Sequence, residues 1–241
     1  MKMNLTRCFT DQKFSLNKKL ILENPSSHHL LKVLRKKEGD EIVLFDGKGS
    51  SCLGAIFKIH RSKIEIEVIE IFEKSLRSGI AINLGQSLIK NDPFNLIIQK
   101  ATELGVISFH PLLTDRSVVK IKMTQNRNLR WNLIARGACE QCGENWLPVI
   151  EDPIKLDRWA TNIKSETKIV LSPNADNKIS DFEYNDSVSI AVGPEGDFSN
   201  YEVDSLTEKG FIPVSIGKRI LRAETAAISA ISSVRFSAKE F

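Results

Sequence analysis

The chain has 241 residues, enough for one large domain or two small ones, and its 41% hydrophobic and 27% charged residues are typical of a globular protein. No apolar run reaches the length of a membrane span, and the first ten residues lack the apolar core of a secretory signal, so we expect a cytoplasmic protein with no membrane partner. Four cysteines in a chain of this size do not indicate a disulfide framework.

Positive charge is unevenly distributed along the chain. Residues 1–75 carry 14 Lys and Arg against 10 Asp and Glu, whereas residues 76–241 carry 20 of each. A second basic stretch has no acidic residue between Asp115 and Glu140 and contains Arg116, Lys120, Lys122, Arg127, Arg130 and Arg136. Such regions attract a polyanion, most simply nucleic acid, but charge alone is equally consistent with a solvated surface.

Residues 1 to about 73 are predicted to form a small β-rich domain. A short helix over 27–35 precedes a strand over 41–45, which ends in the Asp46-Gly47 turn signal. A second strand is predicted over 52–60, and residues 63–72 alternate between apolar and acidic side chains, the pattern of a half-buried strand. Short strands with tight turns favour a small barrel, and the linker is predicted over 73–79.

From residue 80 onward, predicted strands alternate with predicted helices, which favours a parallel α/β sheet. The strands are predicted over 80–84, 106–112, 169–171, 187–192 and 211–216. The helices are predicted over 92–104, about 126–141, 199–209 and 223–236, with Asp92 and Ser199 as the N-caps of the first and third. In open parallel sheets, ligands bind beyond the carboxyl ends of the strands.

Two of these strands end in turns that are candidates for ligand binding or catalysis. Gly193-Pro194-Glu195-Gly196 is neither a P-loop nor a dinucleotide-binding fingerprint. Its glycines would let a flat ligand approach the backbone, although the tetrapeptide alone is also consistent with a plain tight turn. After the last strand, the cations Lys218, Arg219 and Arg222 surround Glu224, which suits an anionic substrate or proton handling, or else a surface loop with a salt bridge.

Other candidate sites have structural explanations. Cys139 and Cys142 have metal or redox spacing, but zinc needs four ligands and no other Cys or His cluster lies near, so we predict a structural role and no metal. His28 and His29 are predicted to face solvent or RNA, because no Ser or Cys has a nucleophile-elbow context for a hydrolytic triad. The small side chains of the last helix suit a chain crossing, a dimer interface or an ordinary core.

Six segments, in this order, resemble one family. They are 29–35 (HLLKVLR), 44–47 (LFDG), 98–106 (IQKATELGV), 138–143 (ACEQCG), 192–196 (VGPEG) and 216–226 (IGKRILRAETA). On these segments the chain, over essentially its whole length, resembles the RsmE family, the 16S ribosomal RNA uridine-N3 methyltransferases of the SPOUT (α/β-knot) superfamily. The resemblance implies a PUA-like β-barrel over 1–73 that helps hold RNA. It also implies a SPOUT α/β domain over 74–241 whose C-terminal segment forms a trefoil knot, a rare exception to unknotted chains.

The resemblance further implies that S-adenosylmethionine binds in the knot. The residues that match the family's cofactor pocket are Leu171, Ser172, Pro173, Val192, Gly193, Pro194, Glu195, Gly196, Ile216, Gly217, Arg219, Ile220, Leu221, Arg222, Thr225 and Ala226. Arg222 and Glu224 are the predicted catalytic residues. Arg222 would hold the uracil oxygens or a nearby phosphate and favour the N3 anion, and Glu224 is either a base or the residue that orients Arg222.

The implied partners are 16S rRNA of the small ribosomal subunit and a second copy of the chain in a homodimer. RNA contacts are predicted for Arg7, His29, Arg35, Lys36, Lys90, Arg116 and Arg136. The sequence departs from the family at 91–93 (Asn-Asp-Pro), at Asp197, where glycine is common, and at Lys218, where proline is frequent. Two other interpretations stay open: a non-catalytic RNA-binding or ribosome-assembly factor, which would bind RNA without the cofactor, and a SPOUT methyltransferase acting on transfer RNA.

Overall fold

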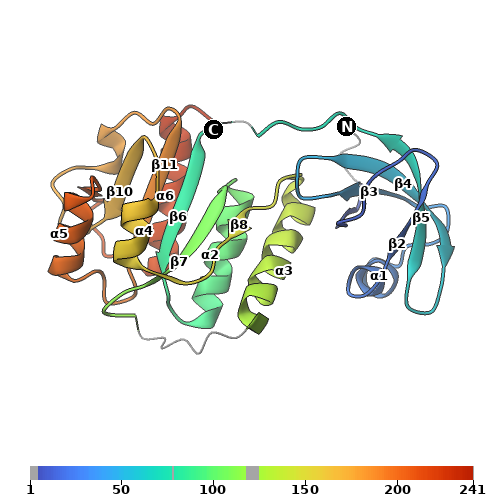
Figure 1. Ribbon diagram of the computed structural model, residues 1–241, viewed down its shortest axis with the longest axis horizontal. Coiled ribbons are helices and arrows are strands. Elements are labelled where there is room, and N and C mark those ends of the chain that lie inside the picture. Colours follow the sequence, from blue (N-terminus) through green and yellow to red (C-terminus); the bar gives the residue numbers. More distant parts are fainter. Residues whose placement is uncertain (1–4, 78, 118–124, 241) are drawn as a thin grey trace. The chain divides into compact units, whose positions relative to one another are not determined.

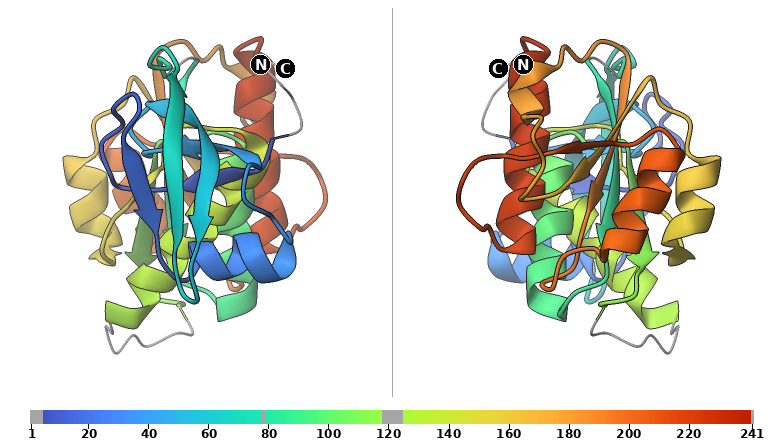
Figure 2. Two further views of the ribbon diagram at one scale, coloured as in Figure 1. Left: turned by 90° about the vertical axis from the view of Figure 1, so that its right-hand side faces the viewer. Right: turned by 90° about the vertical axis from the view of Figure 1, so that its left-hand side faces the viewer.

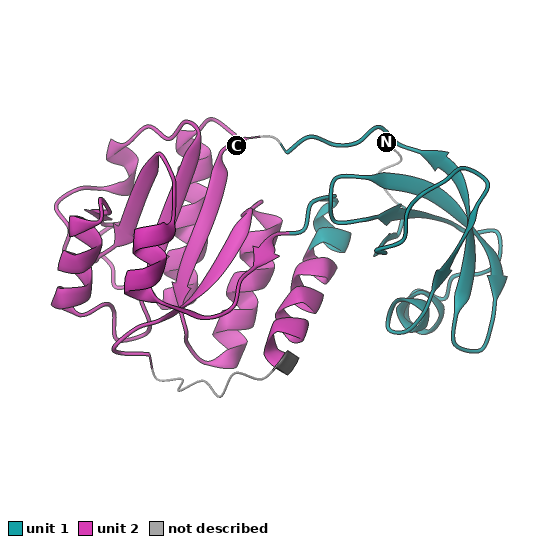
Figure 3. Ribbon diagram, viewed as in Figure 1, with its two compact units in different colours: residues 1–77, 139–147 teal, residues 78–138, 148–241 magenta. Residues whose placement is uncertain are grey.

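The computed structural model describes residues 5–77, 79–117 and 125–240, with only the backbone at 125 and 126. The chain divides into two compact units, coloured separately in Figure 3. The first unit comprises residues 1–77 together with 139–147, and the second comprises 78–138 together with 148–241. The boundary predicted from the sequence at 73 lies four residues before the end of the first stretch of the first unit. The prediction also assigned residues 139–147 to the second domain, whereas in the structure they belong to the first unit.

The first unit is built on a five-stranded sheet with the order β1-β3-β4-β5-β2. Its elements are β1 (Arg7–Phe9), β2 (Lys19–Leu22), α1 (Ser26–His28) with a π-helical turn over His29–Val33, β3 (Glu41–Phe45), β4 (Ser51–Ile59) and β5 (Ile64–Ile71) (Figure 1). The three predicted strands agree with β3, β4 and β5 to within one residue at each end. The edge strands β1 and β2 escaped prediction because three or four residues are too few to reveal a period.

The second unit contains a sheet in which every strand pair is parallel, in the order β12-β10-β11-β6-β7-β8, with β9 also paired to β7. The predicted parallel sheet is therefore confirmed. Its strands are β6 (Ala81–Ser87), β7 (Ser108–Leu113), β8 (Val149–Ile150), β9 (Ile154–Lys155), β10 (Thr167–Leu171), β11 (Ser187–Val192) and β12 (Ile212–Val214). Its helices are α2 (Asn91–Glu103), α3 (Gln125–Cys142), α4 (Leu156–Asn162), α5 (Asn200–Glu208) and α6 (Ala223–Ser237), with a 3-10 turn, η2, over Ile179–Asp181.

Helices cover both faces of this sheet. In the two side views of Figure 2, α4 and α5 lie on one face and α2 and α6 lie on the other. On the first face, Trp159 of α4 packs against Phe211, with the ring centroids 5.3 Å apart. On the second face, Phe94 of α2 packs edge-on against Phe109 of β7 at 5.4 Å. Burial on both faces explains why β10 and β11 end in continuous apolar runs, over 169–171 and 190–192, rather than in alternating ones.

The far end of α6 is anchored by a buried arginine. Arg235, which is 7% exposed, donates hydrogen bonds to the carbonyl oxygens of Leu104 (2.9 Å) and Gly105 (2.7 Å), and it pairs with Glu240. These hydrogen bonds join the C-terminal end of α6 to the C-terminal end of α2. The first turn of α6 therefore lies at the other end of the helix, at the carboxyl edge of the sheet.

Helix boundaries follow the predicted caps in one case and not in another. Ser199 is the N-cap of α5, and its capping box with Glu202 is confirmed, because Ser199 Oγ accepts from the Glu202 N–H at 3.2 Å and Glu202 accepts from the Ser199 N–H at 2.9 Å. The N-cap predicted at Asp92 is wrong. Helix α2 begins at Asn91 with Lys90 as N-cap, so Asp92 lies in the first turn, where its charge still favours the helix dipole.

Three short elements, β8, β9 and α4, were not predicted, and β12 is shorter than the predicted strand over 211–216. None of the helices in the described part of the chain combines the length and apolar character needed to span a bilayer.

Candidate active site

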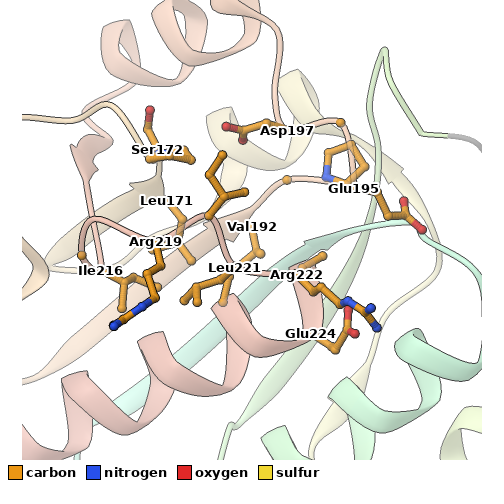
Figure 4. Close-up of a pocket in the computed structure, with 18 of the residues that line it drawn as sticks. Leu171, Ser172, Val192, Glu195, Asp197, Ile216, Arg219, Leu221, Arg222 and Glu224 are labelled. Atoms are coloured by element: carbon orange, nitrogen blue, oxygen red, sulfur yellow. The ribbon is translucent and has the colours of Figure 1, made fainter.

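A cavity of about 740 Å³ lies at the carboxyl ends of the central strands (Figure 4). Three loops form most of its wall: the loop after β10, the glycine turn after β11, and the loop that joins β12 to α6. Apolar side chains come from the strand ends and that last loop, namely Leu171, Val192, Val214, Ile216 and Leu221. The site is where an open parallel sheet places its ligands, and the volume is that of a small-molecule pocket.

The glycine turn at 193–196 is packed tightly at its first residue. A side chain at Gly193 would place its Cβ 2.9 Å from Asp197 Oδ1 and 3.0 Å from the Phe198 nitrogen. Beneath the turn, the fully buried Gln86 donates to the Gly193 carbonyl oxygen at 3.3 Å. A side chain at 193 would therefore crowd the Asp197 carboxylate and the Phe198 backbone, and the turn is held from below.

Arg116 and Glu202 hold the same turn from outside. Arg116 Nη1 donates to the carbonyl oxygens of Gly196 (2.8 Å) and Phe198 (3.4 Å). The carboxylate of Glu202, which is 6% exposed, accepts from the backbone N–H of Asp115 at 2.9 Å as well as completing the cap of α5. The loop after β7 and the loop after β11 are thus joined by charge-assisted hydrogen bonds, which are stronger than neutral ones.

Charged side chains of both signs line the cavity. Arg219 and Arg222 are exposed, and Glu224 is half-buried in the first turn of α6. Figure 4 shows Arg222 and Glu224 on one side of the cavity and Asp197 on another. Burial raises the pKa of the half-buried Asp197, and the nearby charge of Arg116 opposes this rise in part. The cavity can therefore present separate cationic and anionic groups to a ligand.

The cavity brings together the residues that were predicted to bind a cofactor, with one exception. Thr225 is exposed and does not line it. Five further lining residues were not predicted, and neither was Gln86 beneath the glycine turn; the five are Pro93, Asn174, Asp197, Val214 and Ala223. The sequence held no distinct signal for Gln86, because β6 also contains the polar residues Asn83 and Ser87 and the predicted strand over 80–84 ended before position 86.

The residues predicted to bind RNA differ in solvent exposure and in whether their side chains already make hydrogen bonds. His29, Arg35 and Lys90 are exposed, whereas Lys36 and Arg136 are half-buried. Arg7 donates to Glu144 and Asn145 within the first unit and stacks over Phe45, so its guanidinium is already engaged. Arg116 is exposed but braces the glycine turn. Lys120 and Lys122 of the basic stretch lie outside the described residues.

The CxxC segment contains one buried and one exposed thiol. The Cys139 thiol donates to the Trp146 carbonyl oxygen at 3.5 Å, and burial raises its pKa to about 12, so it stays protonated. Cys142 is exposed. In the described ranges, no group of three or more His, Cys, Asp and Glu side chains is placed to hold a metal ion.

Comparisons with known proteins agree with this geometry. Residues 77–235 match the family model described as an RNA methyltransferase domain, and residues 22–69 match that of an RNA methyltransferase PUA domain. The ribosomal RNA small subunit methyltransferase E of Buchnera aphidicola (subsp. Schizaphis graminum) is 34% identical over 239 residues, which cover 98% of this chain and 97% of the relative. The protein of the same name from Bacillus subtilis is 31% identical over 221 residues, covering 87% and 86%.

The chain belongs to the ribosomal RNA small subunit methyltransferase E family. The family predicted from the six sequence segments is confirmed, and so is the combination of a PUA-like region with an α/β methyltransferase domain. Two solved structures resemble this methyltransferase over nearly its whole length. A methyltransferase from Legionella pneumophila in complex with S-adenosylmethionine has a TM-score of 0.92 at 31% identity, covering 98% of both chains. The methyltransferase E of Neisseria gonorrhoeae, bound to the same cofactor, has a TM-score of 0.89 at 31% identity, covering 97% of this chain and 98% of its own.

Proposed function

We propose that this protein transfers a methyl group from S-adenosylmethionine to N3 of a uridine in 16S rRNA of the small ribosomal subunit. The observation that carries the proposal is the cavity, whose wall contains both the glycine turn and the pair Arg222 and Glu224. The solved relatives that bind this cofactor share the fold of the whole chain.

The residues of the cavity fit this cofactor. Apolar side chains at the ends of three neighbouring strands suit a flat adenine ring. A Cβ added to Gly217 would meet no atom within 4 Å, so glycine leaves open space beside the loop. The acidic and basic side chains around this apolar floor suit a ligand that carries an ammonium, a carboxylate and a sulfonium group.

The cofactor supplies an electrophilic methyl group on a sulfonium centre. The chain must place N3 about 3–3.5 Å from that methyl group, accept the imide proton from N3, and stabilise the negative charge that its loss leaves on the base. Arg222, exposed at the N-cap of α6, can bind the uracil oxygens or a nearby phosphate and favour the N3 anion. Glu224 would either accept the proton or orient Arg222. The target base must leave its stack to reach the cavity.

Mass spectrometry of nucleosides from 16S RNA, taken from cells with and without this gene, tests the proposal. We expect 3-methyluridine to disappear with the gene, to return with the wild-type chain and to stay absent with Arg222→Ala. Unchanged 3-methyluridine in 16S RNA would refute the proposal. RNA binding without cofactor binding would then indicate an assembly factor, and loss of a methylated nucleoside from transfer RNA would indicate a different substrate.

Exposed cations near the cavity are proposed to hold RNA phosphates. Lys90 follows β6 and therefore lies at the carboxyl edge of the sheet, the edge that also contains the cavity. We expect Lys90→Ala to weaken RNA affinity roughly 5-fold at low salt, and to reduce the slope of log affinity against log salt by about 1, because each phosphate contact releases a counterion. Affinity would be measured by fluorescence anisotropy over a salt series.

Lys164 offers the matched control, because it is exposed but precedes β10 and so lies at the amino edge. Lys164→Ala should leave both the affinity and the salt slope unchanged. Equal effects of the two substitutions would mean that RNA binding depends on net charge and not on this edge.

The brace formed by Arg116 predicts an effect on cofactor binding that needs no RNA. Arg116→Ala removes the hydrogen bonds to Gly196 and Phe198, and because the guanidinium is exposed we expect the Kd for S-adenosylmethionine to rise only about 3- to 10-fold. Isothermal titration calorimetry without RNA would measure this. Arg130→Ala, an exposed arginine of the same basic stretch, should leave the Kd unchanged; a rise of the same size would show that lost charge, and not the lost brace, is responsible.

We also propose that the C-terminal segment is knotted. Ser215 N–H donates to the Asn177 carbonyl oxygen (2.8 Å), and Ile179 N–H donates to the Ser215 carbonyl oxygen (3.1 Å), so residues 177–179 run parallel to the chain just before the 216–222 loop. Helix α6 then contacts η2. Contacts that hold the 177–181 segment against both sides of the 216–222 loop support a trefoil knot, which is rare among proteins.

A homodimer acting in the cytoplasm completes the proposal. Ile220 is 90% exposed and Phe236 is 70% exposed, and a homodimer interface would cover such apolar side chains of the second unit. Light scattering coupled to size-exclusion chromatography would give the mass of the particle, and a monomer would contradict the dimer.

A further inference from the structure

Asp197 has a backbone conformation that a glycine would adopt more easily. Its φ is 60°, in the left-handed region where a side chain is disfavoured and where Asp and Asn are tolerated better than most residues. It follows the glycine turn directly and lines the cavity. Because glycine would avoid the strain at this position, we expect the Asp197 carboxylate to make an interaction that offsets the strain.

The hydrogen bond that caps the turn uses only one of the two oxygens of the Asp197 carboxylate. Asp197 Oδ1 accepts a hydrogen bond from the backbone N–H of Phe198 at 2.8 Å, which stabilises the turn locally. Among the described residues, no donor bonds the second oxygen, Oδ2, and no Lys or Arg forms an ion pair with Asp197. Arg116, whose charge acts to lower the pKa of Asp197, directs its Nη1 to the carbonyl oxygens of Gly196 and Phe198 instead.

A half-buried carboxylate without a cation is unfavourable unless a ligand supplies one. Burial removes water from around the Asp197 carboxylate and raises its pKa, in the direction that this cost requires. The RNA substrate is anionic, so its phosphates would be repelled here. S-adenosylmethionine, by contrast, carries two cations: the sulfonium and the α-ammonium group.

We propose that Asp197 is a cofactor-binding residue whose carboxylate receives a cationic group of S-adenosylmethionine. The proposal rests on the proposed methyltransferase function and deepens it. In Figure 4, Asp197 lies on a different side of the cavity from Arg222 and Glu224, so it acts on the cofactor and leaves the uridine to that pair. Asp197 thereby adds affinity that the apolar floor alone cannot provide.

Calorimetric titration of the full chain with S-adenosylmethionine and with S-adenosylhomocysteine tests the proposal. Asp197→Asn keeps the acceptor that caps the turn and tolerates the left-handed backbone, but it removes the charge. We expect it to raise the Kd for S-adenosylmethionine roughly tenfold with an unchanged Tm. Asp197→Gly, which relieves the backbone strain, should raise the Kd as much. Asp204→Asn, an exposed acid of α5 outside the cavity, is the control for net charge and should have no effect.

The two ligands distinguish the two cations. S-adenosylhomocysteine has the ammonium group but no sulfonium, so equal losses for both ligands assign Asp197 to the ammonium, and a larger loss for S-adenosylmethionine assigns it to the sulfonium. Wild-type affinity in Asp197→Asn would overturn the proposal and leave Asp197 as a turn cap, with the methyltransferase function untouched. Absence of cofactor binding by the wild-type chain would overturn both.

Discussion

Arg222→Ala is expected to lower the turnover number about 10²–10⁴-fold while changing the Kd for S-adenosylmethionine less than about 3-fold. The reason is that Arg222 is exposed at the mouth of the cavity and makes no hydrogen bond or ion pair of its side chain with other described residues. Its removal therefore costs the fold little. What is lost is the charge that stabilises the N3 anion of the uridine. Single-turnover methylation of 16S RNA, together with calorimetry, would measure both quantities.

Two variants sharpen this result. Lys218 belongs to the same loop and is exposed, but it does not line the cavity, so Lys218→Ala should stay within about twofold of the wild-type turnover number. Arg222→Lys keeps the charge without the planar fork and should lie between the alanine variant and the wild type. If Arg222→Ala lost cofactor affinity as strongly as turnover, Arg222 would be a cofactor ligand and its role on the base would be wrong.

The location of the site could be predicted from the sequence because its signals are local. A buried strand at 187–192, a glycine turn and a Ser199–Glu202 capping box lie within sixteen consecutive residues, and the structure reproduces all three. A parallel sheet then places the turn beside the other strand ends, whatever lies between them in the chain. The local pattern therefore predicted which loops would meet in the cavity.

Partners that are distant in the chain could not be predicted in this way. Arg116 reaches Gly196 across 80 residues, and Arg7 reaches Asn145 across 138. Both were predicted to bind RNA because a sequence records the charge of a side chain but not where its hydrogen bonds go. The contacts of the Cys139–Leu147 segment with the first unit, and the ion-pair-free state of Asp197 in the described residues, depend on tertiary packing in the same way.

Gly193→Ala is expected to lower the Tm by about 2–12 °C and to weaken binding of S-adenosylmethionine more than tenfold. Its new Cβ would stand 2.9 Å from Asp197 Oδ1, so the Asp197 carboxylate must shift, and 3.0 Å from the Phe198 nitrogen, so the backbone must give by a few tenths of an ångström. The backbone cannot move freely, because Gln86 holds the Gly193 carbonyl oxygen and Arg116 holds that of Phe198. Crowding of this kind costs about 1–3 kcal/mol, and each kcal/mol lowers the Tm of a chain this size by roughly 2–4 °C.

Gly196→Ala is the matched control on the other side of the turn. A Cβ at Gly196 would meet only the Cδ and Cβ atoms of Arg116, at 3.7 and 3.8 Å, which is ordinary van der Waals contact. Its Tm should therefore stay within about 1 °C of the wild type by differential scanning fluorimetry. A similar loss of Tm in both variants would mean that the turn needs backbone freedom at each glycine, and the explanation from crowding at Gly193 would fail. A loss confined to Gly193→Ala would show that the cofactor cavity keeps its shape only when residue 193 has no Cβ.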